Sequence, residues 1–181
     1  MSTTLKGKKI AILATDGFEQ VELTQPKQDL EAEGAEVTVI SLDTTPNEIR
    51  GWDMTDWGAT VKVDRLVSNA TPKEFHALLL PGGVISPDKL RIDKVAVQFV
   101  KEFVASGKLV AAICHAPWTL IEADVVRGKN MTSWQSLRTD LTNAGAAWVD
   151  EQVVVDGQFI TSRSPKDLPA FSRQIIRALA T

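Results

Sequence analysis

Apolar runs and stretches with helical spacing alternate along most of this chain. Continuous or alternating apolar character predicts strands at 8–15, 36–43, 76–83 and 108–114, with shorter ones at 59–64 and 130–133. Helical spacing predicts helices at 21–34, 87–107, 115–126, 136–145 and 164–180. Strand–helix alternation of this kind predicts an α/β fold with a mostly parallel sheet covered by helices on both faces.

Individual turn and proline residues refine these predicted elements, and none of them indicates a boundary between domains. Pro26 lies inside the first helical stretch and predicts a kink or a restart there. Asp156-Gly157 is suited to the tight turn of a β-hairpin. No internal repeat, low-complexity run or long linker interrupts the 181 residues, so we expect a single domain over 1–181.

Composition and charge exclude several classes of function. The net charge of −3 leaves no broad basic surface for nucleic acid. One cysteine rules out an internal disulfide and a Cys-rich metal site, and two histidines are too few for a structural zinc cluster. We expect no metal and no organic cofactor. The early apolar run 10–14 is too short for a signal-peptide core or a membrane span, so we expect a soluble cytoplasmic protein.

The single cysteine, Cys114, carries most of the functional information. It ends the strand 108–114, and a histidine and then a helical pattern follow it directly. A strand–turn–helix of this kind is a nucleophile elbow, which exposes the nucleophile at the carboxyl end of a strand. The start of the following helix would also favour the reactive thiolate. The alternative is a small core cysteine, which the terminal position and the polar neighbour argue against.

The carboxyl ends of parallel strands gather at one edge, which brings 16–19, 81–83 and 114–116 together. His115 is a candidate general base for the thiol, and the alternative is a side chain that faces solvent and has no catalytic role. Its backbone N–H is a candidate oxyanion donor even if the imidazole takes no part in the reaction. Gly83 is a candidate second donor, although a PGG sequence also makes an ordinary turn.

Two acids complete the set of candidates. Glu19 follows the first strand, and a buried, protonated carboxyl there would donate a hydrogen bond to the sulfur. Asp88 follows the PGG turn and is a candidate for orienting the imidazole of His115. The alternative for each acid is a structural role, because acidic residues near a helix N-terminus commonly stabilise the helix dipole.

A set of motifs in fixed order resembles the ThiJ/PfpI superfamily, and is most similar to its PfpI branch of intracellular proteases. The superfamily also includes the parkinsonism-associated deglycase and is related to class I glutamine amidotransferase domains. The motifs cover nearly the whole chain: FEQVEL, ALLLPGG, Pro87-Asp88, AAICHAPW, RGKNMTS, NAGAAWVDEQVVVDG and ITSRSPKDLPAF.

The resemblance implies a flavodoxin-like sandwich that assembles as a homodimer or hexamer. It implies Cys114 as the nucleophile, Glu19 as its buried carboxyl neighbour, and Gly83 and His115 as the oxyanion donors. In the PfpI branch the histidine pairs with an acid of a neighbouring subunit, and the matching position here is Asp88. Two departures stand out: the branch usually has Glu at this acid position, and Gly where this chain has Ala116.

Three functions fit these residues. The first, favoured by the branch, is a stress-related cysteine hydrolase acting on peptide or amide bonds through Cys114, His115 and Asp88. The second is a cofactor-free glyoxalase or protein deglycase that acts on methylglyoxal and its adducts and needs no acid from another subunit. The third is a non-enzymatic redox-sensing stress protein or holdase, in which Glu19 stabilises oxidised Cys114.

Overall fold

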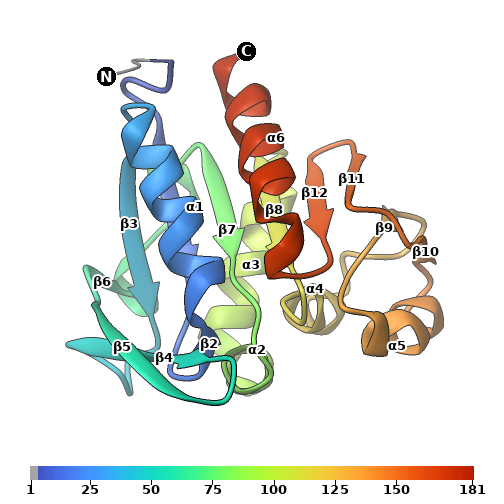
Figure 1. The fold of residues 1–181 in the computed structure, drawn as a ribbon, viewed down its shortest axis with the longest axis horizontal. Coiled ribbons are helices and arrows are strands. Elements are labelled where there is room, and N and C mark those ends of the chain that lie inside the picture. Colours follow the sequence, from blue (N-terminus) through green and yellow to red (C-terminus); the bar gives the residue numbers. More distant parts are fainter. Residues whose placement is uncertain (1–3) are drawn as a thin grey trace.

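A computed structural model describes residues 4–181 of the chain (Figure 1). Its main sheet has the strand order β11-β12-β8-β7-β1-β3-β6. The strands are β1 (Lys9–Leu13), β3 (Glu36–Ser41), β6 (Arg65–Leu66), β7 (Ala77–Leu80), β8 (Leu109–Ile113), β11 (Val153–Asp156) and β12 (Phe159–Ser162). Only the β11–β12 pair is antiparallel, and it forms the hairpin predicted around Asp156-Gly157. The predicted α/β fold with a mostly parallel sheet is confirmed.

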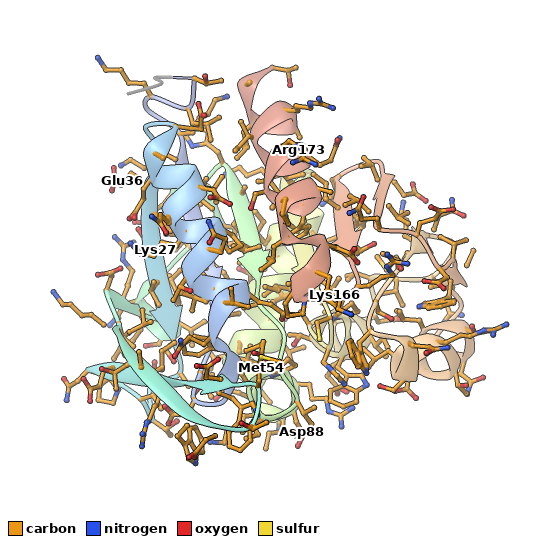
Figure 2. All side chains as sticks on the ribbon, viewed as in Figure 1. Lys27, Glu36, Met54, Asp88, Lys166 and Arg173 are labelled. Carbon is orange, nitrogen blue, oxygen red and sulfur yellow. The ribbon has the colours of Figure 1, made fainter. Side chains whose placement is uncertain are left out.

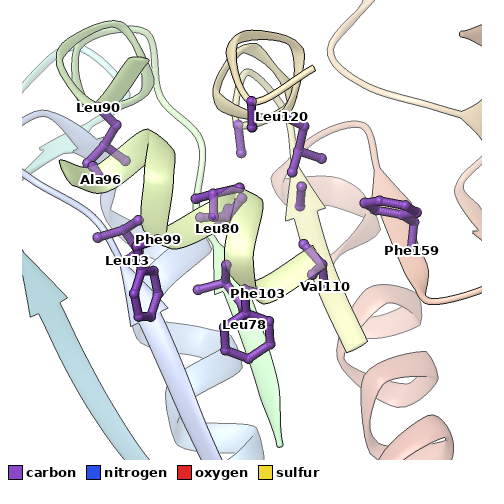
Figure 3. Close-up of a cluster of buried hydrophobic side chains, with 14 of the residues drawn as sticks. Leu13, Leu78, Leu80, Leu90, Ala96, Phe99, Phe103, Val110, Leu120 and Phe159 are labelled. Atoms are coloured by element: carbon purple, nitrogen blue, oxygen red, sulfur yellow. The ribbon is translucent and has the colours of Figure 1, made fainter. Parts of the chain in front are cut away.

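Helices cover both faces of this sheet because its central strands are apolar on both sides. In β1, Ala11 and Leu13 join one buried cluster, whereas Ile10 and Ile12 join the other. The first cluster packs against α2 (Ile85–Ile92), α3 (Lys94–Ala105), α4 (Pro117–Glu122) and α5 (Arg138–Asn143), as Figure 3 shows in part. The second packs against α1 (Gln20–Ala32) and α6 (Leu168–Ala180), which lie side by side in Figure 1. None of the helices within 4–181 has the length and apolar character that a membrane span requires.

The prediction of one helix over 87–107 is wrong, because two helices occupy this stretch. Asp93 separates α2 from α3 with an extended backbone (φ −85°, ψ 112°). Its carboxylate accepts hydrogen bonds from the backbone N–H groups of Val95 and Ala96 at 3.0 and 2.9 Å, and so caps α3. The two helices present a joint apolar face, which is why their pattern resembles that of one long helix. At Pro26 the helix α1 continues without interruption.

Short elements surround the carboxyl edge of the main sheet. A three-stranded sheet contains β2 (Phe18–Glu19), β4 (Glu48–Asp53) and β5 (Asp56–Lys62), and β9 (Asn130–Met131) pairs with β10 (Ala147–Trp148). Single 3-10 turns are η1 (Val67–Asn69), η2 (Pro72–Glu74), η3 (Gln135–Leu137) and η4 (Pro165–Asp167). The sequence pattern did not reveal β4, because its polar residues and its bulge obscure the period of two.

Candidate active site

Cys114 follows β8 directly and has a left-handed backbone conformation, with φ of +62°. A non-glycine residue in this region is uncommon and needs support from its surroundings. The Cys114 N–H donates to the Ser162 carbonyl at 3.0 Å, and its carbonyl accepts from the Trp134 N–H at 3.0 Å. The turn therefore has the strained geometry expected of a nucleophile elbow, although the thiol residue is only 6% exposed.

The buried carboxyl beside this thiol belongs to Glu22. One of its oxygens, Oε2, accepts a hydrogen bond from the Gly82 N–H at 2.9 Å. The other, Oε1, is buried without an N–H or hydroxyl partner among the described residues, and the carboxyl interacts with the Cys114 thiol. Burial raises the pKa of Glu22 to about 8, and the negative charge of Glu19 adds to the rise. Glu22 is therefore mostly protonated at pH 7 and has a proton to donate to the sulfur.

Glu19, the expected neighbour of the thiol, lies elsewhere. It is the last residue of β2, is half-buried, and its Oε1 accepts a long hydrogen bond of 3.4 Å from the Met54 N–H in the β4–β5 hairpin. Because α1 starts at Gln20, Glu22 lies in the first helical turn and faces the sheet. The buried carboxyl beside the thiol is therefore that of Glu22, three residues after the expected Glu19.

Backbone N–H groups of Gly83 and His115 donate to the Cys114 sulfur. These are the two groups expected to act as oxyanion donors, and the structure brings both to the thiol. Gly83 has φ of +83°, and a Cβ there would lie 2.5 Å from the backbone nitrogen of Glu19. Only glycine therefore allows the chain to pass so close to β2.

The resting state of the thiol differs from the expectation that the elbow favours thiolate. Burial raises the pKa of Cys114 well above its usual range, and negative charge on Glu22 raises it further. The N–H groups of Gly83 and His115 lower the pKa, but they do not outweigh burial. Moreover, α4 has only six residues, so its dipole is short. The thiol is neutral at rest and needs a base to become nucleophilic.

The imidazole of His115 lies within hydrogen-bonding distance of the thiol. Its Nδ1 lies 3.1 Å from the Cys114 sulfur, and its Nε2 lies 3.4 Å from the Ser136 hydroxyl oxygen. The ring packs edge-on against Trp118 and stacks on Trp134, with centroids 5.2 and 6.0 Å away. Burial lowers the pKa of His115, so the imidazole is neutral at pH 7 and can accept a proton.

Asp88 does not contact His115 within the chain. Its exposed carboxylate accepts two hydrogen bonds from Arg91, at 3.0 and 2.6 Å. Arg91 in turn lies over the Trp118 ring, 4.6 Å from its centroid. Figure 2 shows Asp88 pointing outward from α2. The single chain therefore brings together Cys114 and His115 but leaves Asp88 apart.

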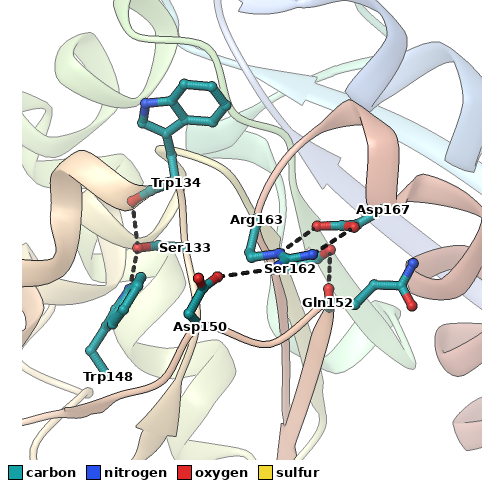
Figure 4. Close-up of polar contacts among 8 residues, drawn as sticks. All are labelled: Ser133, Trp134, Trp148, Asp150, Gln152, Ser162, Arg163 and Asp167. Carbon is teal, nitrogen blue, oxygen red and sulfur yellow. Dashed lines mark hydrogen bonds and ion pairs between the residues drawn. The ribbon is translucent and has the colours of Figure 1, made fainter.

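A polar network borders the site on the side of β12 (Figure 4). Arg163 donates to Asp167 at 2.8 and 3.2 Å and to Asp150 at 2.9 Å. Trp134 and Arg163 line the same cavity of about 260 Å³. The interpretation of the sequence missed Trp134 and Ser136, since they follow Cys114 by about 20 residues and no local pattern marks them. Glu22 did have a signal, as the second acid of the FEQVEL motif.

No group of three or more His, Cys, Asp or Glu side chains within residues 4–181 could hold a metal ion.

Comparisons with known proteins agree with this geometry. Residues 8–178 match the DJ-1/PfpI family. "Protein/nucleic acid deglycase 2" of Escherichia coli K12 is 47% identical over 173 residues, which are 95% of this chain and 98% of the relative. "Putative cysteine protease YraA" of Bacillus subtilis 168 is 44% identical over 172 residues, covering 95% and 98% of the two chains. The crystal structure of Drosophila melanogaster DJ-1beta superposes with a TM-score of 0.87 at 28% identity, covering 99% of this chain and 91% of that one. The match over nearly the whole length confirms the expected resemblance, and the chain belongs to the DJ-1/PfpI family.

Proposed function

We propose that this protein uses Cys114 to process small reactive aldehydes, as a cofactor-free glyoxalase or deglycase acting on methylglyoxal and its early adducts. The observation that carries the proposal is the position of the thiol. It contacts both the protonated carboxyl of Glu22 and the neutral imidazole of His115, and both groups come from the same chain. Two proton carriers in contact with one thiol suit a reaction that adds to a carbonyl and then moves a proton.

The first step forms a bond between the Cys114 sulfur and the aldehyde carbon. His115 Nδ1 takes the thiol proton, and the electron pair of the C=O bond moves to oxygen. The N–H groups of Gly83 and His115 are within reach to stabilise that oxyanion, which then receives the proton to give a hemithioacetal.

The second step moves the C1 proton of the hemithioacetal to C2 through an enediol. This transfer needs a base beside the sulfur, which is Glu22 in its ionised form or His115. The product is a thioester of lactate on Cys114, and water hydrolyses it to lactate and the free thiol. Methylglyoxal and water are thereby converted into lactate without an oxidant or a reductant.

Peptide hydrolysis is the second candidate, and one specific observation favours it. Asp88 is exposed and follows the PGG turn at the same sheet edge, so its carboxylate is open to a second copy of the chain. Protonation of a leaving amine requires an imidazolium, and a carboxylate partner would stabilise it. However, Arg91 already pairs with Asp88 in the single chain, and that pair would have to break.

The change Asp88→Asn separates the two candidates. We expect the methylglyoxal turnover of the variant to stay within about twofold of wild type, because exposed ion pairs contribute little and the aldehyde route does not use Asp88. The measurement is methylglyoxal loss and lactate formation, in parallel with cleavage of fluorogenic peptide amides, with Cys114→Ser as the blank. Asp124→Asn is the control for loss of an exposed i,i+3 carboxylate, since Asp124 pairs with Arg127 at 3.8 Å, a longer contact than the 2.6 Å between Asp88 and Arg91.

Each pattern of results has a clear meaning. Aldehyde turnover that requires Cys114 and ignores Asp88 supports the proposal. Peptide cleavage lost in both Cys114→Ser and Asp88→Asn, with no aldehyde turnover, would replace it with the peptidase. Wild-type protein that turns over neither substrate, but converts Cys114 to sulfinate under mild peroxide, would point instead to redox sensing.

A further inference from the structure

The imidazole of His115 has a hydrogen-bonding partner at each of its two nitrogens. Nδ1 lies 3.1 Å from the Cys114 sulfur, and Nε2 lies 3.4 Å from the hydroxyl oxygen of Ser136. The second distance is long for a hydrogen bond, but such bonds are often long in free enzymes and tighten when substrate binds. Trp118 and Trp134 contact the ring from two sides and limit its rotation.

We propose that Ser136 is a positioning residue for His115, which orients the imidazole so that His115 can exchange a proton with Cys114 within one chain. This role rests on the function proposed above, in which His115 takes the proton of the Cys114 thiol and Ser136 orients the His115 ring. Ser136 thereby takes the role that a carboxylate from a second subunit would otherwise have.

The direction of proton transfer decides which nitrogen carries the hydrogen. For Nδ1 to accept the proton of Cys114, it must be unprotonated, and the neutral ring then carries its hydrogen on Nε2. That Nε2–H donates to the Ser136 oxygen. When the thiol proton moves from sulfur to Nδ1, the imidazolium keeps this bond, and Nδ1 later returns the proton to the oxyanion of the substrate. Ser136 itself gains and loses no proton.

The local backbone holds Ser136 in place although its side chain is exposed. Leu137, the next residue, is fully buried and anchors η3. The Leu137 N–H donates to the Trp134 carbonyl at 3.0 Å, and the Trp134 N–H donates to the Cys114 carbonyl at 3.0 Å. The segment that carries the hydroxyl is thus tied to the elbow that carries the thiol.

None of the charged groups that the structure describes near the His115 ring forms a hydrogen bond that could orient it in place of Ser136. Arg91 lies over the Trp118 ring, and Asp140 accepts a hydrogen bond from the Trp118 indole at 2.8 Å. Glu22 contacts the thiol, and Asp88 is paired with Arg91. No hydrogen bond joins any of these four groups to the His115 ring within the described residues.

The test compares Ser136→Ala and Ser136→Thr, with Thr139→Ala as a control for an exposed hydroxyl three residues further on. The first readout is the rate of Cys114 alkylation by iodoacetamide between about pH 5.5 and 9, a range that spans ordinary His and Cys titration. We expect Ser136→Ala to lower the rate at pH 7 about fivefold, as for the loss of one hydrogen bond, and to move the rise in rate to higher pH. Thr keeps the hydroxyl and should restore the profile, and Thr139→Ala should not change it.

The second readout is methylglyoxal turnover, where Ser136→Ala should lower kcat and leave KM unchanged. A wild-type pH profile and kcat in Ser136→Ala would overturn the proposal. Equal losses in Ser136→Ala and Ser136→Thr, together with lower thermal stability, would show a structural role and also overturn it. If the wild type does not turn over methylglyoxal, the proposed function fails, but the alkylation profile still tests Ser136 on its own.

Discussion

Replacing Glu22 with alanine should lower methylglyoxal turnover by about 100-fold or more, the usual effect of removing a positioned acid or base. Glu22 is the carboxyl beside the Cys114 thiol, and burial raises its pKa to about 8. It can therefore give a proton to the sulfur or the substrate near neutral pH, and take one back when ionised. The measurement is kcat and kcat/KM for methylglyoxal loss in wild type and Glu22→Ala.

Glu22→Gln is the matched variant that separates proton transfer from hydrogen bonding. Glutamine keeps a carbonyl that can accept the Gly82 N–H and an amide N–H that can face the sulfur, but it cannot transfer a proton. We expect turnover to fall as far as in Glu22→Ala, whereas the alkylation rate of Cys114 should stay near that of wild type. Near-normal turnover in Glu22→Gln would exclude proton transfer by this carboxyl.

The same carboxyl should make the stability of the fold depend on pH. The pKa of Glu22 is raised from about 4.5 to about 8 on folding, so the folded state holds a proton that the unfolded state has lost across this range. The free energy of unfolding therefore falls as the pH rises from about 4.5 to about 8, by at most about 5 kcal/mol. Urea denaturation at both ends of this range should show the fall in wild type and a smaller fall in Glu22→Gln. An equal fall in both would mean that Glu22 is not protonated in the folded protein.

The change Gly82→Ala should destabilise the fold by about 3 kcal/mol or more and disrupt the site. A Cβ at this position would lie 2.5 Å from Glu22 Oε2, 2.6 Å from the Cys114 Cβ and 2.7 Å from the Ile113 carbonyl oxygen. Two of these atoms belong to the elbow and cannot move aside as a flexible side chain could. Overpacking in a dense core typically costs about 1–3 kcal/mol, and here a buried hydrogen bond between Gly82 and Glu22 is strained as well. The measurement is the free energy of unfolding in urea, together with the alkylation rate of Cys114.

Gly107→Ala is the control for this prediction. Gly107 has φ of +73° at the end of α3, and a Cβ there would meet no atom within 4 Å. Alanine at this position adds only the strain of a left-handed conformation, about 1 kcal/mol, with no effect on the thiol. If Gly82→Ala is no more destabilising than Gly107→Ala, then the strand end does not pack against the elbow as closely as these distances indicate.

Local patterns in the sequence were sufficient for most of the fold. The continuous apolar character of β1, β7 and β8 indicates strands buried on both faces, and these in turn require helices on both sides. The position of Cys114 at the end of a strand is also a local property, since neighbouring residues alone define a strand–turn–helix. The sequence did not reveal the break at Asp93, because a short cap between two helices leaves their joint apolar pattern almost unchanged.

The partners of the thiol depended on tertiary structure. Two acids of one motif, Glu19 and Glu22, differ only in whether they precede or follow the start of α1, and the phase of that helix against the sheet decides which one is buried. Ser136 reaches His115 from a segment about 20 residues away, because the Trp134 N–H binds the Cys114 carbonyl. Thus the sequence by itself determined the sheet, the elbow and the position of the candidate nucleophile, which follow from hydrophobic periodicity and local turns. Only the tertiary structure decided which carboxyl lies beside the Cys114 thiol and which hydroxyl lies beside His115, because contacts between distant segments depend on how the elements pack.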